Sequence, residues 1–488
     1  MSSAQIVDLW KYQVEDIEWF LKNPRSMILY EPRMGKTVVT TNVIARDPNC
    51  RSILLACSKN AVGTWIDHLI VWYKHLQPGL KLEIRLIRGK NSSAPAQRKH
   101  LYLFPRSADV TVYITSFASL DKDWDWLQKQ WPGFDTFIGD EVHKKWRKRQ
   151  NKGAEVARGI AKRVRRFHAL SGSLGGKKGP QDYWAVLNMI DHREFSSYWR
   201  FVNRFCIELK NHWGGVEHID LINVAEFHQL LDKYSRRRFR HVEALWMPKV
   251  VRSLIPVQMD ALQMRVYDEL VADGFSFTED KMIIAATAME GVIRMRQLFA
   301  CPSIFDTNLG MGAAWQDLLD RLADDDEDVE LNTTDKHIVI FTPFKQAFPH
   351  MRKSLEQAGF KVYQLSGGIE HEEQRTQIDG FKQSKGVMLC TISYAQAFSL
   401  VPAQQCFFFG YDFDPSENRQ AEDRLIPPTG SYPINAWYYC YKGTHDETIA
   451  EQVNQHQRTI TLTVGSAVKF MQQRGDNEEA KSLGPKAT

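Results

Sequence analysis

The first residues able to do chemistry form a short loop near the N-terminus. The loop 31–37 reads Glu-Pro-Arg-Met-Gly-Lys-Thr and lies between a strand-like run, 26–30, and a helical segment, 38–45. Backbone amides at the start of a helix can face phosphate oxygens, Lys36 can reach the outer phosphates, and Thr37 can hold Mg²⁺. The context therefore predicts a phosphate-binding loop.

This loop is poor in glycine. Tyr30 stands where the strict motif has its first glycine. A bare Gly-Lys-Thr is also common by chance, so the loop alone does not establish a nucleotide site. The loop residues that we assign to the nucleotide are Met34, Gly35, Lys36 and Thr37.

An acidic pair supplies the second element. The strand-like run 136–139 ends in Asp140-Glu141-Val142-His143, and open α/β sheets place ligand chemistry at the carboxyl ends of their strands. Asp140 would hold Mg²⁺ through water, and Glu141 would orient or deprotonate the attacking water. The alternative is a carboxylate pair that caps the next helix, which the upstream Gly-Lys-Thr loop makes the weaker reading.

A third candidate follows another strand-like run, 167–170. Ser171 and Ser173 are small hydroxyl residues in Leu-Ser-Gly-Ser. They would sense the acidic pair and couple it to a second lobe. Taken alone, this sequence is an ordinary turn.

These motifs need parallel strands to position them. Short apolar runs alternate with amphipathic helical patterns in both the first and the last third of the chain, which predicts parallel sheets covered by helices. The strand-like runs lie at 26–30, 52–57, 83–87, 110–116, 136–139, 167–170, 337–341, 361–365, 387–392, 406–410 and 436–441.

The middle of the chain has a different pattern. It is rich in helical periodicity, Trp and Arg, with few strand-like runs, and 257–269 and 285–299 are expected helices. The sequence thus predicts an α/β fold with two sheet lobes and a helical insert. The expected parts are lobe 1 at 1–180, the insert at 181–322, an acidic linker at 323–335, lobe 2 at 336–472 and a polar tail at 473–488.

Composition sets the broad class. The 488 residues are 43% hydrophobic and 25% charged, which is typical of a soluble protein with more than one domain. Seven cysteines without short spacings predict reduced, mostly buried thiols. No signal peptide and no long apolar run is visible, so we expect a cytoplasmic protein that does not span a membrane. Basic runs at 144–152, 162–166 and 236–240 suit phosphate backbones or, alternatively, solvated surface.

The ordered motifs resemble the Swi/Snf-like group of superfamily 2 helicases and translocases over roughly residues 8–460. The insert is the most specific part, because general helicases lack it. The motifs that carry the resemblance include Leu9-Trp10-Lys11-Tyr12-Gln13, Trp65, Ile114-Thr115-Ser116-Phe117, Asp182-Tyr183-Trp184, Arg236-Arg237-Arg238, Arg296-Gln297-Leu298, Gln420-Ala421-Glu422-Asp423-Arg424 and Gly443-Thr444-His445-Asp446-Glu447.

The resemblance implies two RecA-like lobes around an ATP cleft, a Mg²⁺ ion and translocation on double-stranded DNA. Gln13 would read adenine, while Glu141, Gln420 and Arg424 would serve catalysis. We expect a monomer, and the absence of chromatin-type flanking segments favours a bacterial or phage protein. The expected nucleic-acid contacts are Lys144, Lys145, Arg147, Arg236 and Arg237.

Two departures from the family pattern leave alternatives open. The fifth motif, usually rich in glycine, reads Ala-Gln-Ala-Phe-Ser-Leu at 395–400, and the second arginine of the sixth motif is replaced by Pro427. One alternative is therefore a DNA-binding factor whose catalysis is weakened, so that it turns ATP over slowly. Another is an RNA helicase, against which the insert argues.

Overall fold

Two compact units make up the described chain, one up to Ala244 and the other from Leu245 onward. The computed structural model describes residues 8–58, 61–87, 95–172, 174, 179–210, 216–279, 282–323, 337–368, 371–395, 398–427, 432–447 and 450. Ser173 and the segments expected as acidic linker and polar tail beyond Ala323 lie outside the described residues.

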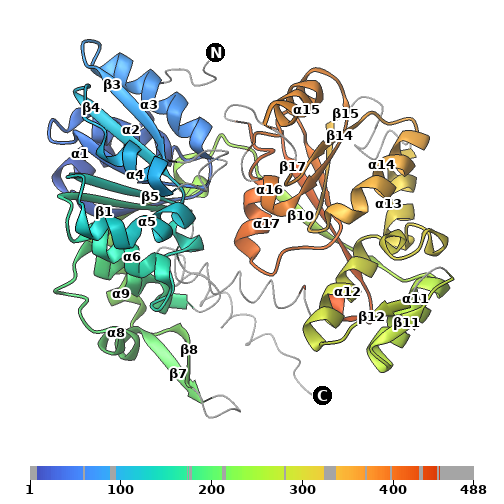
Figure 1. Ribbon diagram of the computed structural model, residues 1–488. Coiled ribbons are helices and arrows are strands. Elements are labelled where there is room, and N and C mark those ends of the chain that lie inside the picture. The colour runs from blue at the N-terminus through green and yellow to red at the C-terminus, as the bar shows by residue number, and fades with distance from the viewer. Residues whose placement is uncertain are drawn as a thin grey trace, which may run out of the picture. The chain divides into compact units, whose positions relative to one another are not determined.

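The first unit contains a seven-stranded, fully parallel sheet in the order β3-β4-β2-β5-β6-β1-β9 (Figure 1). Every residue of β2, β4, β5 and β6 is buried, as expected for apolar strands covered on both faces. The strands are β1 Arg25–Tyr30, β2 Ser52–Ala56, β3 Leu82–Ile87, β4 Val110–Thr115, β5 Thr136–Asp140, β6 Arg166–Ser171 and β9 Ser235–Arg238.

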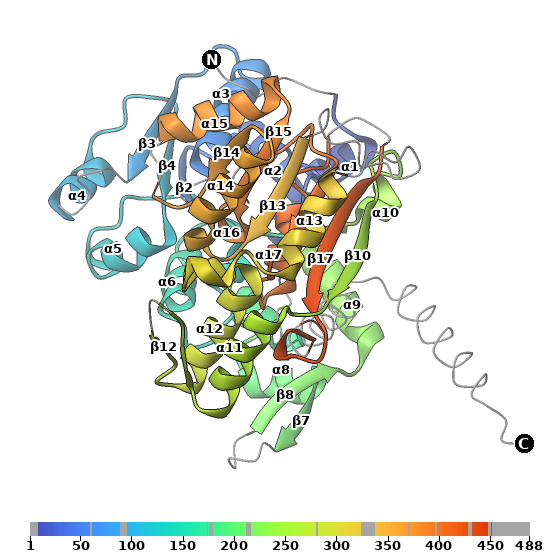
Figure 2. The same ribbon diagram turned by 90° about the vertical axis from the view of Figure 1, so that its right-hand side faces the viewer.

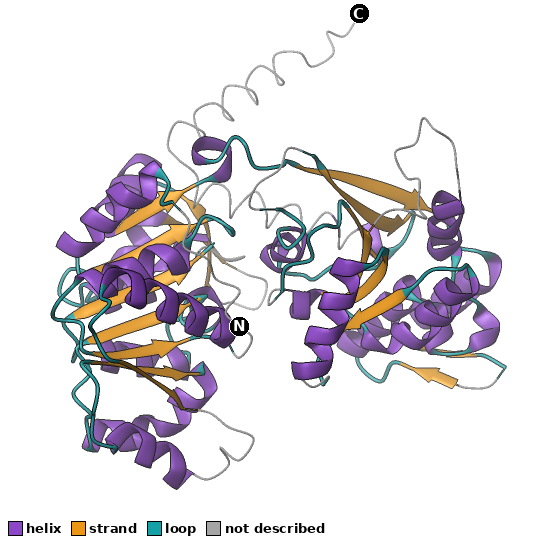
Figure 3. Cartoon of the chain, turned by 90° about the horizontal axis from the view of Figure 1, so that it is seen from above, coloured by secondary structure: helices purple, strands orange, loops and turns teal. Residues whose placement is uncertain are grey.

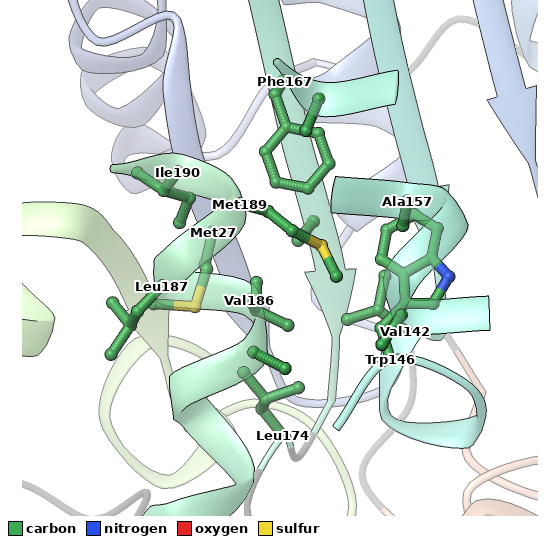
Figure 4. Close-up of a cluster of buried hydrophobic side chains, with 14 of the residues drawn as sticks. Met27, Val142, Trp146, Ala157, Phe167, Leu174, Val186, Leu187, Met189 and Ile190 are labelled. Atoms are coloured by element: carbon green, nitrogen blue, oxygen red, sulfur yellow. The ribbon is translucent and has the colours of Figure 1, made fainter. Parts of the chain in front are cut away.

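Helices lie on both faces of this sheet (Figure 3). The α-helices of the first unit are α1 Lys11–Lys22, α2 Lys36–Arg46, α3 Val62–Leu76, α4 Pro95–Leu103, α5 Phe117–Lys129, α6 Lys152–Ala161, α7 Trp184–Ile190, α8 Tyr198–Phe205, α9 Val224–Tyr234 and α10 Arg240–Glu243. An antiparallel hairpin, β7 Cys206–Lys210 and β8 Val216–Leu221, follows α8. Figure 4 shows part of the core, where Met27 of β1, Phe167 of β6 and Val186 of α7 converge.

The second unit contains a six-stranded parallel sheet in the order β10-β17-β16-β13-β15-β14 (Figure 2). Its strands are β10 Val250–Val257, β13 His337–Thr342, β14 Val362–Leu365, β15 Gly386–Thr391, β16 Gln405–Phe408 and β17 Ile434–Tyr441. Its helices are α11 Ala261–Ala272, α12 Ala288–Ala300, α13 Ala313–Ala323, α14 Phe348–Gln357, α15 His371–Gln383, α16 Ile392–Ala395 and α17 Pro415–Glu422. A short hairpin, β11 Phe275–Phe277 and β12 Met282–Ile284, lies between α11 and α12.

Each of the eleven strand-like runs coincides with a strand, so the two predicted parallel-sheet lobes are confirmed. The middle of the chain contains more strands than its periodicity indicated, since β7 to β12 all lie there. The stretch 181–322 is also divided between the two units: β9 joins the first sheet and β10 joins the second. The apolar periodicity did not indicate β9 and β10, because β9 is basic and β10 is half-exposed.

All seven cysteines are buried and form no disulfide. Within the described ranges, no helix has both the length and the apolar character needed to cross a membrane.

Candidate active site

The phosphate loop leaves β1 at Tyr30 and enters α2 at Lys36. Gly35, at the start of α2, has φ 81° and ψ 32°, a left-handed conformation that favours glycine. A Cβ atom at Gly35 would lie 2.4 Å from Nε2 of Gln13, so a side chain there would also displace the end of the Gln13 side chain. The strand, loop and helix therefore have the local structure that the sequence predicted.

Helix α1 packs directly on this loop. The Tyr12 hydroxyl donates a hydrogen bond to the carbonyl oxygen of Met34 at 2.7 Å, and Gln13 Nε2 donates to the same oxygen at 3.3 Å. Gln13 Oε1 accepts from the backbone N–H of Trp10 at 3.0 Å. The structure thus places Gln13 against the loop, and its contact with adenine stays a prediction.

Asp140 is the last residue of β5 and is buried. The indole N–H of Trp65 on α3 donates to Asp140 Oδ2 at 2.8 Å, which fixes the carboxylate. Burial, and next the charge of Glu141, raise the pKa of Asp140 to about 6. A carboxylate held in this way is a good metal ligand once it is ionised.

Glu141 follows in a left-handed conformation, with φ 54° and ψ 49°. Its Oε1 lies 3.7 Å from Lys36 Nζ, and its Oε2 lies 3.2 Å from Nδ1 of His143. Burial alone would raise the pKa of Glu141, but Lys36 and His143 outweigh it and hold the pKa well below its usual range. Lys36 also donates to the carbonyl oxygen of Tyr30 at 3.1 Å. The predicted lysine and the predicted base are therefore neighbours.

Ser171 ends β6 and contacts the acidic motif. Its hydroxyl lies 3.0 Å from Nδ1 of His143, the same nitrogen that faces Glu141. A Cβ built on Gly172 would lie 3.7 Å from Lys36 Nζ, so this turn adjoins the phosphate loop as well. The coupling role of Ser171 and Ser173 stays a prediction.

The donor set fits a magnesium ion. Thr37 offers a hydroxyl in the first turn of α2, and Asp140 offers a carboxylate. Oxygen ligands of this kind, completed by water and phosphate oxygens, are what Mg²⁺ prefers. Thr37 is next to Lys36 in the sequence, and Asp140 is next to Glu141. The contact between Lys36 and Glu141 therefore brings together the segments that carry the two metal ligands.

The predicted residues of the sixth motif lie in the second unit. Gln420 is a buried residue of α17, and Arg424 lies in the turn that follows, where its carbonyl oxygen accepts from the backbone N–H of Leu400 at 2.9 Å. The buried carboxylate of Glu422, two residues before Arg424, accepts from Arg252 of β10 at 2.5–3.0 Å and from the Tyr438 hydroxyl at 2.7 Å. Sequence reasoning missed Arg252.

The basic run after the acidic pair is anchored by Trp146. This side chain is buried against Phe117 and Phe137, with ring centroids 5.4 and 5.3 Å away. Lys144 and Lys145, which precede Trp146 in the sequence, are exposed, and Arg147, which follows it, is half-buried. A buried aromatic residue thus presents two lysines at the surface next to the acidic motif.

The second basic run forms β9, and its arginines have partners within the protein. Arg236 lies over the Trp19 ring at 4.2 Å, and its Nε lies 3.6 Å from Asp16. Arg237 donates to Asp232 at 2.6 Å. These contacts give both arginines a structural role, and their contact with DNA stays a prediction.

Known proteins resemble this chain over most of its length. The chain matches the SNF2-related domain over residues 12–305 and the helicase conserved C-terminal domain over residues 317–426. It is 22% identical to the SWI/SNF chromatin-remodeling complex subunit snf22 of Schizosaccharomyces pombe, covering 85% of this chain and 25% of that protein. It is 21% identical to the mouse DNA annealing helicase and endonuclease ZRANB3, covering 96% of this chain and 42% of that protein.

A solved structure, the Sulfolobus solfataricus SWI2/SNF2 ATPase core in complex with dsDNA, is 15% identical over 94% of both chains, with a TM-score of 0.41. The chain spans a quarter of the length of the yeast relative and less than half of the mouse relative. The SNF2-related match covers more than half of this chain and includes the phosphate loop and the acidic pair. The chain therefore belongs to the SNF2-related family and carries a helicase conserved C-terminal domain in its second unit.

Proposed function

We propose that this protein is an ATP-dependent motor that moves along, or remodels, double-stranded DNA. The observation that carries the proposal is the meeting of Lys36 and Glu141, which lie 3.7 Å apart at the carboxyl ends of the first sheet's strands. A phosphate-binding lysine and a carboxylate base at one sheet edge are what hydrolysis of a nucleotide requires.

Each site residue of the first unit has a distinct role in this proposal. Lys36 and the amides at the start of α2 bind phosphate oxygens, and Gln13 contacts the adenine. Thr37 and Asp140 hold Mg²⁺, which neutralises charge on the phosphates when it is bound. Glu141 orients and deprotonates the attacking water. His143 keeps Glu141 in place through Nδ1, the nitrogen that also contacts the Ser171 hydroxyl.

The second unit contributes charge to the reaction in this proposal. Arg424 stabilises the negative charge that develops on the phosphate oxygens, because a guanidinium stays charged and can grip two oxygens at once. Gln420 supports the same step. Closing of the two units on ATP and opening after hydrolysis would produce alternate grips on the DNA.

Several observations favour DNA as the substrate. The mouse relative is named as a DNA annealing helicase and endonuclease. In this chain Lys144 and Lys145 are exposed immediately after the acidic motif. Exposed lysines bind a phosphate backbone without reading its sequence.

ATP turnover with different activators tests the proposal. Hydrolysis should be stimulated at least about tenfold by duplex DNA, and more than by RNA of the same length. The Lys36→Ala variant serves as the blank, because it lacks the ammonium that pairs with phosphate. Equal stimulation by RNA would favour an RNA helicase, and absence of any hydrolysis by the wild-type protein would overturn the proposal.

A second candidate function rests on Pro427. This buried residue occupies the position of the family's second arginine in the sixth motif, and an arginine near the γ-phosphate is worth about 10³–10⁵ in rate in related chemistry. The protein would then be a DNA-binding factor that uses ATP slowly as a conformational ligand. ATP binding with turnover that duplex DNA does not stimulate is the result that would favour it.

A further inference from the structure

Helix α1 is fastened to the edge of the first sheet through one buried carboxylate. Asp16 is fully buried and accepts from the Tyr30 hydroxyl at 2.5 Å, from Arg238 Nε at 2.8 Å and from Arg238 Nη2 at 2.6 Å. Asp16 belongs to α1, Tyr30 to β1 and Arg238 to β9. The Arg238 guanidinium, with Arg236 Nε of the same strand 3.6 Å from Asp16, thus joins an edge strand to the helix that covers the phosphate loop.

The same edge strand also holds the start of the loop. The backbone N–H of Glu31 donates to the carbonyl oxygen of Arg238 at 3.0 Å, and the backbone N–H of Arg240 donates to Glu31 Oε2 at 2.7 Å. The Arg238 guanidinium lies 5.3 Å from the ring centroid of Tyr12, whose hydroxyl holds Met34. The loop is therefore held at its beginning by β9 and near its end by α1.

The loop needs this support because it has few glycines. Arg33 adopts φ 69°, a left-handed conformation that is unfavourable for a residue with a side chain. Such a conformation persists where the surrounding structure determines it. In a glycine-rich loop the backbone would reach this conformation without cost, whereas here the neighbouring helix and strand impose it.

We propose that Arg238 is a positioning residue for the nucleotide. Through Asp16 it fixes α1, and with α1 it keeps the loop 31–35 in the conformation that receives the phosphates. This inference rests on the proposed function and adds to the same site a residue that the sequence analysis did not assign to the nucleotide. It also assigns the third arginine of the basic run 236–240 to the ATP site rather than to DNA.

Binding of a fluorescent ATP analogue to Arg238→Gln tests the inference. Glutamine cannot pair with both oxygens of Asp16, so α1 and the loop should loosen. We expect Kd to rise at least tenfold, about 1.4 kcal/mol of binding free energy. At saturating ATP, kcat should fall by less than about threefold, because Lys36, Glu141 and Asp140 are retained.

Arg98→Gln is the matched control. Arg98 forms a buried, two-oxygen pair with Asp123 at 2.6–2.9 Å, which joins α4 to α5. Both variants lose a buried arginine–aspartate pair, so both should lower the thermal midpoint. Only Arg238→Gln should raise the Kd. An equal rise in both variants would show that the effect is general destabilisation and would overturn the inference.

Two further variants keep the test decisive if Arg238→Gln does not fold. Arg238→Lys retains the charge but not the two-oxygen grip, so its Kd should lie between the wild-type and Gln values. Asp16→Asn weakens the same pair through the carboxylate. When it is combined with Arg238→Lys, the loss of ATP-binding free energy should be smaller than the sum of the losses in the two single variants. Additive effects, or a wild-type Kd in either single variant, would contradict the positioning role. Failure of the wild-type protein to bind ATP would instead remove the proposed function.

Discussion

The Lys36 ammonium lies 3.7 Å from Glu141 Oε1, and this ion pair joins the phosphate loop to the acidic motif. Burial raises the pKa of Glu141, but the charge of Lys36 is the largest effect that opposes it and contributes to the net lowering. Phosphate oxygens that draw Lys36 toward them would therefore raise the pKa of Glu141. ATP binding would in this way make Glu141 a stronger base at the moment when one is needed.

Glu141→Gln should bind ATP and fail to hydrolyse it. The amide keeps the shape of the side chain but cannot accept a proton from water, so kcat should fall by about 10² or more. Glu155→Gln, at an exposed position of α6, is the matched control and should behave as wild type. Turnover of Glu141→Gln within about threefold of wild type would show that another group activates the water.

The rate of ATP hydrolysis should decline in acid through Asp140. Because the pKa of this carboxyl is raised to about 6, its metal-binding form is lost below that pH. Below about pH 6, kcat/KM should drop by roughly tenfold per pH unit at a fixed Mg²⁺ concentration well below saturation, because saturating Mg²⁺ would hold Asp140 ionised. A rate that is the same at about pH 5 and pH 7 would contradict the role of Asp140.

The raised pKa of Asp140 also predicts how the stability of the fold changes with pH. A folded-state pKa above the usual value of 3.8 means that Asp140 stabilises the fold fully below pH 3.8 and loses this contribution as pH rises through about 6. Asp140→Asn removes the buried charge. It should therefore raise Tm, relative to wild type, more at about pH 8 than at about pH 4. An equal difference in Tm between variant and wild type at the two pH values would contradict a raised pKa of Asp140.

Replacing Lys144 and Lys145 with Gln should weaken binding to unrelated DNA sequences by similar factors. Each lost phosphate contact should flatten the log–log dependence of affinity on salt by about 0.9, or about 1.8 for both. Lys74→Gln, at an exposed position of α3, should leave the slope unchanged. An unchanged slope in the double variant would return these lysines to ordinary solvated surface.

Arg424→Lys should reduce ATP turnover at least tenfold, about 1.4 kcal/mol of barrier, with ATP binding little changed. With proline at 427, Arg424 has to supply charge that two arginines normally share. Lysine is a single point charge and cannot grip two phosphate oxygens. Near-wild-type turnover in saturating duplex DNA would instead indicate an arginine from elsewhere, and Arg419 and Arg375 would be the first to test.

The parallel sheets were predictable because their strands carry local signals. Runs such as 52–57 and 387–392 are apolar except for one hydroxyl residue each, and both coincide with fully buried strands. The acidic pair and the phosphate loop were predictable for a related reason, since each directly follows such a strand. Carboxyl ends of parallel strands lie along one edge, which is why Lys36 and Glu141 meet.

The supporting contacts were not predictable, because they join residues far apart in the sequence. Arg238 pairs with Asp16, 222 positions earlier, and Arg252 pairs with Glu422, 170 positions later. The sequence Ser-Arg-Arg-Arg at 235–238 has no apolar alternation, so nothing local indicates that it forms an edge strand beside β1. A run of arginines indicates a charged surface equally well until its carboxylate partners are known.

Movement along duplex DNA is the most direct test of the central claim. A third strand bound in the major groove of a duplex is displaced when a motor passes, and its release can be followed by fluorescence. The wild-type protein should release the strand only with ATP and Mg²⁺, and Glu141→Gln should release none. Rapid ATP hydrolysis stimulated by the same duplex, without release of the third strand, would contradict a motor that travels along DNA.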